Sequence, residues 1–312
     1  MRRPAVEPAP RRAALVALAA CILPLVAASS RPADADILPS FHNAAGLTQL
    51  PCEHGLDICN VSTHFERLAT TYAAGLNALL ATAQCSKLRG WSLQQLVAAV
   101  GRRRACTWAD ARVVGIWTVL PQSCYVLSPE CEAGVTGTAA PLFSHALFYF
   151  HSLAPAGTQS YEQDASPQLR LAIDRSFGSI ASFRAAFAAA ASQLVGSGWA
   201  WVVALPRAGK LQVLTTSNMD VPLMGGRNDG KSPQRLPILA LELGERAYLQ
   251  GDSTNGSLEE ARAAYIDAFL TRINWQGVSS LHRLAITGQY DTADMLLPSI
   301  AWKQQPPASM QA

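Results

Sequence analysis

Apolar residues recur at helical spacing along the first half of the chain. Between residues 61 and 84 the large apolar side chains stand three or four positions apart, which predicts one buried face of a helix: Phe65, Leu68, Tyr72, Leu76, Leu79 and Leu80. A second helix is predicted over 91–100, with Ser92 as its N-cap. A third is predicted from near Thr138 to residue 153, before Pro155.

The pattern changes to two helices and then strands in the second half. Residues 166–196 read as two helices separated at Gly178. The β-branched and aromatic runs at 198–205 and 210–217 flank the turn residues "PRAG" and predict a hairpin. A third strand is predicted over 236–243. A final amphipathic helix over 257–273 starts with the capping-box pair Ser257 and Glu260.

Helices followed by a small antiparallel sheet wrapped by helices predict an α+β fold with two domains. The N-terminal helical domain is expected at 61–155 and the C-terminal domain, with a three-stranded antiparallel sheet, at 160–285. Residues 29–60 form a polar lead-in and 286–312 a tail. Residues 101–133, with an arginine cluster, three cysteines and two prolines, are predicted to be a loop-rich insertion.

The first 28 residues have the features of a targeting segment. Four arginines precede the apolar run 13–27, and small residues follow, which favours a secretory signal peptide. A mitochondrial or plastid transit peptide is the alternative. A membrane anchor fits less well, because the run is shorter than the roughly 20 residues that span a bilayer and contains Pro24. We expect the secretory pathway or secretion, and no membrane association after processing.

Composition limits the classes of partner. The chain has 312 residues, of which 49% are apolar and 15% charged, so it is globular. Removing residues 1–28 takes away four arginines and one glutamate, which lowers the formal net charge from +3 to 0. The one dense basic cluster, "RRRAC" at 102–106, reads as a solvated loop, and no nucleic-acid partner is expected.

Six cysteines remain outside the targeting segment, and all lie between residues 52 and 131: Cys52, Cys59, Cys85, Cys106, Cys124 and Cys131. In an oxidising compartment an even number predicts up to three disulfides, with every pairing open. A zinc site is the alternative, but no C-x-x-C motif is present.

Three segments of the second half resemble the C-terminal domain of the iron/manganese superoxide dismutases: 177–203, 211–225 and 264–275. The run "GSGWAW" at 196–201 and the pair Asn274-Trp275 are the sequence motifs most specific to that family. The resemblance covers about 61–84 and 134–285. It implies the α+β fold predicted above, a homodimer, and one Fe or Mn ion, held by three His and one Asp, that disproportionates superoxide.

The resemblance also assigns residues of the N-terminal domain. His64 falls on the first ligand position and Tyr72 on the tyrosine that gates access to the metal. His145 falls on the second ligand position, but the following run "ALFYFHSLAP" is one residue longer than in the family. One residue turns a helix by about 100°, so His145 faces the site only if a π-bulge absorbs the extra residue. Otherwise Ala146 occupies the position.

The stretch "ELGERAYLQ" at 242–250 corresponds to the family's second metal motif. Glu242 replaces the ligand Asp and can still coordinate. Arg246 replaces the ligand His and cannot, because its guanidinium stays protonated and would oppose a metal cation. The glutamine that orients the metal-bound water is missing, since its two usual positions hold Pro141 and Met219. Glu245 matches the glutamate that bridges subunits.

Two functions follow from this altered motif. In the first, the protein is a metal-free or weakly metallated pseudoenzyme that acts as a scaffold or interaction module, with Arg246 in the metal pocket paired to Glu242. In the second, it is an active superoxide dismutase with a three-ligand Fe or Mn site formed by His64, His145 and Glu242. Metal-dependent chemistry of another kind is a third possibility.

Overall fold

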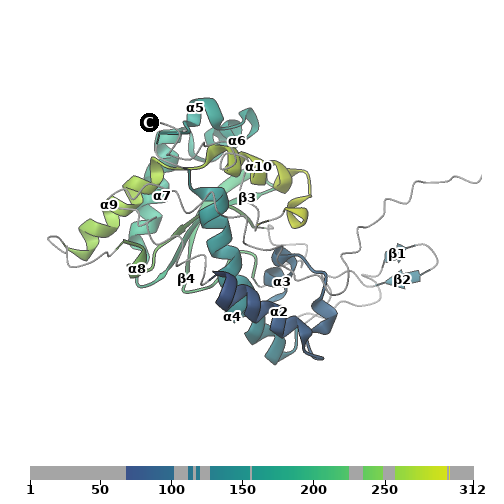
Figure 1. Cartoon of the computed structure of the whole chain (residues 1–312). Coiled ribbons are helices and arrows are strands. Elements are labelled where there is room, and N and C mark those ends of the chain that lie inside the picture. The colour runs from purple at the N-terminus through teal and green to yellow at the C-terminus, as the bar shows by residue number, and fades with distance from the viewer. Residues whose placement is uncertain are drawn as a thin grey trace, which may run out of the picture.

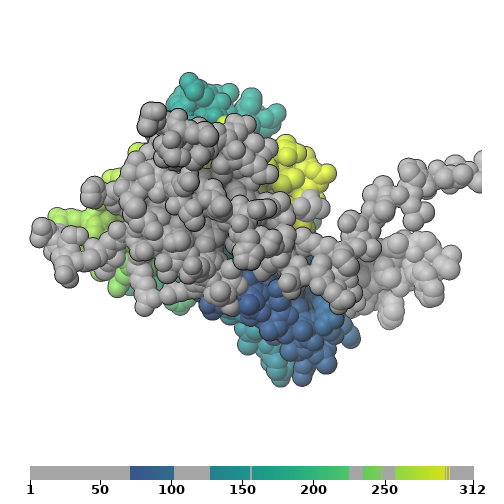
Figure 2. All heavy atoms as spheres, viewed as in Figure 1, coloured from purple at the N-terminus to yellow at the C-terminus, as the bar shows by residue number. Residues whose placement is uncertain are grey.

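The computed structural model describes residues 68–101, 112–114, 117–119, 127–154, 157–224, 235–248, 257–293 and 295. These residues form an N-terminal group of helices and a C-terminal sheet with flanking helices (Figure 1). The predicted α+β class is therefore confirmed. In the space-filling view the described residues 68–101 form a protruding blue lobe (Figure 2).

The first two predicted helices are present in the described part of the chain. A π-helical segment, η2 (Leu68–Ala73), leads into α2 (Ala74–Ala81). After the 3-10 turn η3 (Ser86–Leu88), α3 spans Leu93–Ala99. Ser92 accepts from the Gln95 N–H and the Gln95 side chain accepts from the Ser92 N–H, so the expected cap is a full capping box.

The third helix starts earlier than predicted. Helix α4 spans Pro129–Ala146, so a start near Thr138 is wrong, and the loop-rich insertion is correspondingly shorter. Ser128 caps the helix by accepting from the Cys131 N–H, and Pro129 stands in the first turn, where its missing N–H costs no hydrogen bond. The insertion also contains a short antiparallel hairpin of β1 (Arg112–Val114) and β2 (Trp117–Val119).

One disulfide joins the described N-terminal helices. Cys85, after α2, is bonded to Cys131 in the first turn of α4, with 5.7 Å between their Cα atoms. This is one of the up to three predicted bridges. The other four cysteines, Cys52, Cys59, Cys106 and Cys124, lie outside the described residues.

The C-terminal part begins with three helices, α5 (Tyr161–Asp164), α6 (Pro167–Phe177) and α7 (Ile180–Gln193). Gly178 ends α6 with a φ of +85°, a conformation that glycine adopts without strain. The strands β3 (Gly198–Leu205), β4 (Lys210–Ser217) and β5 (Leu236–Glu242) form an antiparallel sheet in the order β4-β3-β5, close to the predicted bounds.

Four further elements complete the described fold: α8 (Glu245–Tyr248), α9 (Leu258–Leu270), α10 (Trp275–Ile286) and the 3-10 turn η7 (Tyr290–Thr292). Two residues of the family-specific motifs, Asn274 and Gly198, have structural roles here. Asn274 caps α10 by accepting from the Gly277 N–H at 2.9 Å. A Cβ atom at Gly198 would lie 2.1 Å from the Thr216 carbonyl oxygen, so only glycine fits at the start of β3.

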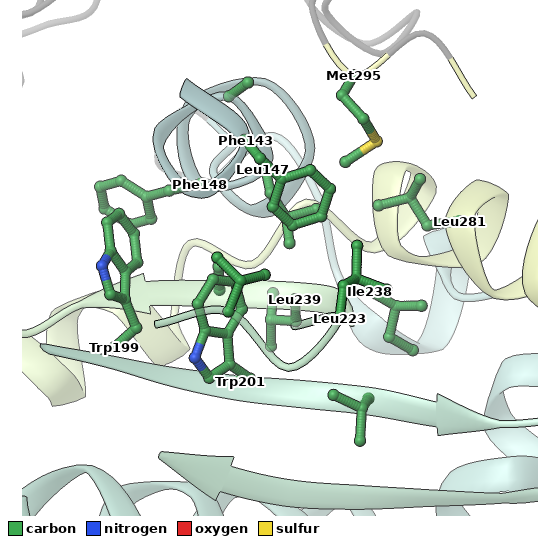
Figure 3. Packing of buried hydrophobic residues seen from close by; sticks show 14 of the residues in the cluster. Phe143, Leu147, Phe148, Trp199, Trp201, Leu223, Ile238, Leu239, Leu281 and Met295 are labelled. Carbon is green, nitrogen blue, oxygen red and sulfur yellow. The ribbon is translucent and has the colours of Figure 1, made fainter. Parts of the chain in front are cut away.

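The core lies between the sheet and the helices on its two sides. The π-helical segment η6 (Leu147–Ser152), which continues α4, contacts β5 together with α10, whereas α6 and α7 contact β4. Because β3 is central and covered on both faces, its residues are buried from Gly198 to Ala204. Figure 3 shows Phe148 and Leu147 pointing from the helix onto Trp199 and the neighbouring strand residues. This packing fixes the helix that carries His145 over the end of the sheet.

None of the described helices is long and apolar enough to cross a membrane. The predicted targeting segment lies outside the described residues.

Candidate functional site

Two of the sequence-predicted site residues meet where α4 passes the end of β5. Nε2 of His145, in the last turn of α4, lies 3.6 Å from Oε2 of Glu242, the last residue of β5. The side chains are 8% and 18% exposed, so water screens the contact only partly. The fold therefore brings together residues that are 97 positions apart in the sequence.

The orientation of His145 depends on the π-helical turn that follows it. Segment η6 (Leu147–Ser152) has the wider winding that accommodates one extra residue. The Ser152 hydroxyl donates to the Leu147 carbonyl at 2.9 Å and accepts from the Ala240 backbone N–H at 2.9 Å. Ser152 thus ties the π-turn to the strand that carries Glu242. His145, and not the buried Ala146, faces the carboxylate.

The backbone fixes the tautomer of His145. Its Nδ1 lies 2.7 Å from the Pro141 carbonyl oxygen, which can only accept, so Nδ1 carries the hydrogen. Nε2 is then the atom that faces Glu242. A lone pair on Nε2 would face the lone pairs of the carboxylate, and this arrangement is favourable only with a proton or another cation between the two atoms.

Aromatic rings surround the imidazole of His145. The Tyr72 ring is stacked with a centroid separation of 6.0 Å, and the Tyr149 ring is stacked at 6.4 Å. Trp199 meets the imidazole edge-on at 5.1 Å. Tyr72 therefore lies beside His145, and its role as the gating tyrosine stays a prediction. Tyr149 and Trp199 were not predicted as site residues, although Trp199 lies in the "GSGWAW" motif.

Tyr265 of α9 is a second site residue that the sequence did not predict. Its side chain is 2% exposed, and its hydroxyl has no hydrogen-bond partner among the described residues. Burial, followed by the negative charge of Glu242, raises the pKa of Tyr265 well above 10. The Tyr248 ring lies 5.8 Å from it. The phenol stays neutral, and its O–H is a donor in the vicinity of the Glu242 charge.

The other predicted site residues are less fully placed. His64 lies outside the described residues. Arg246 lies in α8, four residues after Glu242, but only its backbone is described, so its pairing with Glu242 stays a prediction. Within the described ranges no three His, Cys, Asp or Glu side chains gather to hold a metal ion.

Comparisons with known proteins identify the family. The family described as "Iron/manganese superoxide dismutases, C-terminal domain" matches residues 165–281. Among curated proteins, the superoxide dismutase [Fe] of Legionella pneumophila subsp. pneumophila (strain Philadelphia 1) is 33% identical over 153 residues, which are 48% of this chain and 68% of the relative. The chain belongs to the iron/manganese superoxide dismutase family.

Membership in the superoxide dismutase family implies an iron or manganese ion, and two described side chains suit one. A metal bonded at about 2.1 Å to two donors holds them about 3.6 Å apart when the bond angle is about 120°. The separation of the His145 and Glu242 donor atoms is 3.6 Å. The hydrogen bond from Nδ1 to the Pro141 carbonyl is also a contact that metal-bound histidines make.

Among the described residues, the donor set is smaller than a dismutase metal centre needs. Catalytic metal sites generally use at least three protein ligands, and the described residues supply two. The motif position four residues after Glu242 holds Arg246, a permanent cation without a lone pair to donate. The described residues therefore supply only two of the ligands of the metal centre that the family implies.

Proposed function

We propose that this protein is a superoxide dismutase-fold pseudoenzyme, in which a proton shared by His145 and Glu242 takes the place of the metal. The protein then serves as a scaffold or interaction module rather than as a dismutase. The observation that carries this proposal is the direct approach of Nε2 to Oε2 at 3.6 Å, with Nδ1 already donating to Pro141.

The charges of the site support the proposal. An imidazolium at His145 donates from both nitrogens, to the Pro141 carbonyl and toward the Glu242 carboxylate, so no buried lone pair is left facing another. Arg246 adds a further positive charge to the motif. In this proposal the imidazolium of His145 balances the charge of Glu242, and a metal ion would have to displace the shared proton.

The second candidate is an active dismutase, and one observation favours it. The spacing of the two donor atoms and the hydrogen bond from His145 to Pro141 would also suit a bound metal. His145 and Glu242 would then hold Fe or Mn with His64 as third ligand, and Tyr72 would stand at the entrance. The metal would supply the one-electron redox chemistry that converts superoxide into oxygen and hydrogen peroxide.

A dismutation assay separates the two candidates. The full chain is produced in a host supplied with iron and with manganese, and superoxide decay is followed by pulse radiolysis. The pseudoenzyme predicts decay no faster than in buffer. The variant Tyr72→Phe controls for traces of host dismutase. A decay rate that is equal in the natural chain and in this variant would come from such traces, because the substitution does not affect them. Saturable decay that scales with bound metal and falls in Glu242→Ala would refute the proposal.

The compartment and the assembly are further proposals. We propose that the chain enters the secretory pathway, because the Cys85–Cys131 disulfide suits an oxidising compartment. Labelling of thiols before and after reduction tests this, and free thiols at both positions in native protein would contradict it. We also propose a homodimer, for which family membership and the exposed Glu245 on α8 are the support. Light scattering would give the mass of one chain if the proposal is wrong.

A further inference from the structure

A second group of side chains converges at the far end of the central strand. Leu205 at the end of β3, Lys210 at the start of β4 and the facing sides of α6 and α10 enclose an open cavity of about 210 Å³. Trp199, which touches His145, precedes Leu205 by six residues on β3, or about 20 Å at about 3.3 Å per residue. The cavity is therefore separate from the His145–Glu242 site.

Apolar side chains form much of its wall. On α6 the lining positions are Gln168, Leu171, Ala172 and Arg175, whose spacing of three and four residues puts them on one face. Ile286 on α10, a helix that contacts α6, also lines the cavity. Leu171 and Ile286 are 49% and 45% exposed, which is unusual for large apolar side chains in the described part of the chain. A ligand in the cavity would cover both.

Positive charge is concentrated at the same place. Arg175 and Lys210 both line the cavity and are exposed, and no carboxylate is among its described lining residues. Neither cation forms an ion pair in the part of the chain that the structure describes. Two unpaired cations beside apolar walls attract an anion, and they hold a carboxylate through charge-assisted hydrogen bonds.

A buried histidine completes the wall. His282 of α10 is 5% exposed, and its Nδ1 has no hydrogen-bond partner among the described residues. Burial lowers the pKa of His282 below 6.5, so the ring is neutral at pH 7. The apolar part of a ligand can therefore lie beside it without desolvating a charge. A buried polar atom without a partner is uncommon and is often satisfied by a water or a ligand.

We propose that this cavity binds small monocarboxylates with an apolar body. Arg175 and Lys210 hold the carboxylate, and the hydrocarbon part lies against Leu171, Leu205 and Ile286. A buried cavity of about 150 Å³ accepts benzene. A cavity of about 210 Å³ is therefore large enough for a benzene ring that carries a carboxylate. This site is independent of the proposed pseudoenzyme function.

Titration of the full chain with sodium benzoate tests the proposal, with benzyl alcohol and benzylamine as neutral and cationic probes of similar size. Calorimetry at constant ionic strength should give a benzoate Kd on the order of 1 mM, as is usual for a ligand of this size. Benzyl alcohol should bind at least fivefold more weakly, and benzylamine should not bind. Benzoate binding that is absent, or no tighter than that of benzyl alcohol, would overturn the proposal.

Matched variants locate the site. The double variant that combines Arg175→Gln with Lys210→Gln should weaken benzoate binding at least tenfold. Its unfolding temperature should stay the same, because both side chains are exposed. The control Arg283→Gln removes one exposed charge from α10 outside the cavity and should change Kd less than twofold. If the control loses as much affinity as the pair, the attraction is a general charge effect and the proposed site is wrong.

Discussion

The contact between His145 and Glu242 predicts a measurable coupling energy. Nε2 of His145 and Oε2 of Glu242 lie 3.6 Å apart, in side chains that are 8% and 18% exposed, and the proposed shared proton makes them an ion pair. An effective dielectric constant of about 20 gives an attraction of about 4 to 5 kcal/mol at this distance, before desolvation and partial exposure are taken into account. Since desolvation opposes the attraction in buried pairs, we expect a net coupling of about 1 to 3 kcal/mol.

A double-mutant cycle measures this coupling. Glu242→Gln removes the charge with little change of shape, and His145→Gln keeps an amide nitrogen near the position of Nε2. Each single change should destabilise the fold by about 2 to 4 kcal/mol, because it leaves a buried partner without its counter-charge. The double variant should be less destabilised than the sum of the two, by the coupling energy.

Urea unfolding in the presence of a chelator, followed by tryptophan fluorescence, gives the four free energies. Glu259→Gln on α9 is the control, since that glutamate is exposed and its removal should cost less than about 0.5 kcal/mol. A coupling below about 0.5 kcal/mol under these metal-free conditions would refute the internal ion pair. It would mean that the two side chains are held together by the surrounding packing alone.

Three further substitutions test the π-turn, the buried His282 and the disulfide. Ser152→Ala should cost about 1 to 3 kcal/mol in urea unfolding, because it leaves the buried Ala240 N–H without its acceptor; a cost near zero would mean that the π-turn does not depend on this bond. Burial lowers the pKa of His282, so on acidification the unfolded chain takes up the proton at a higher pH than the folded chain does. The free energy of unfolding should therefore fall as pH drops below about 6.5. His282→Phe should make the free energy of unfolding depend less on pH in this range. The double change Cys85→Ser and Cys131→Ser should lower stability by about 2 to 4 kcal/mol, seen as a lower unfolding midpoint without reductant and no difference with it.

The sequence predicted the C-terminal sheet well because its signals are local. The strand β3 is rich in β-branched and aromatic residues and is bounded by Gly198 and the turn after Leu205. Helix α4 was harder, since Pro129 marks a loop in most contexts but stands in the first turn of a helix here. Its neighbour Ser128 was the signal that could have placed the start correctly.

The candidate site was predictable only in part. The altered motif predicted Glu242 as a candidate ligand, because the replacement of the ligand Asp by Glu is visible in the sequence. The direction of His145 was not, because it depends on whether one residue enters a π-turn, and that turn is stabilised by the long-range bond from the Ala240 N–H to Ser152. Tyr265 was missed because nothing in its local sequence shows that α9 brings it into the vicinity of Glu242.

The amount of metal bound to each chain decides between the pseudoenzyme and an active dismutase. It is measured by mass spectrometry of the purified full chain, beside a variant that combines Glu242→Asp with Arg246→His and so restores the family's ligand types. We expect less than about 0.1 Fe or Mn per natural chain, because Arg246 cannot donate a lone pair to a metal, and a clear rise in the variant. Nearly one Fe or Mn in each natural chain would contradict the pseudoenzyme proposal.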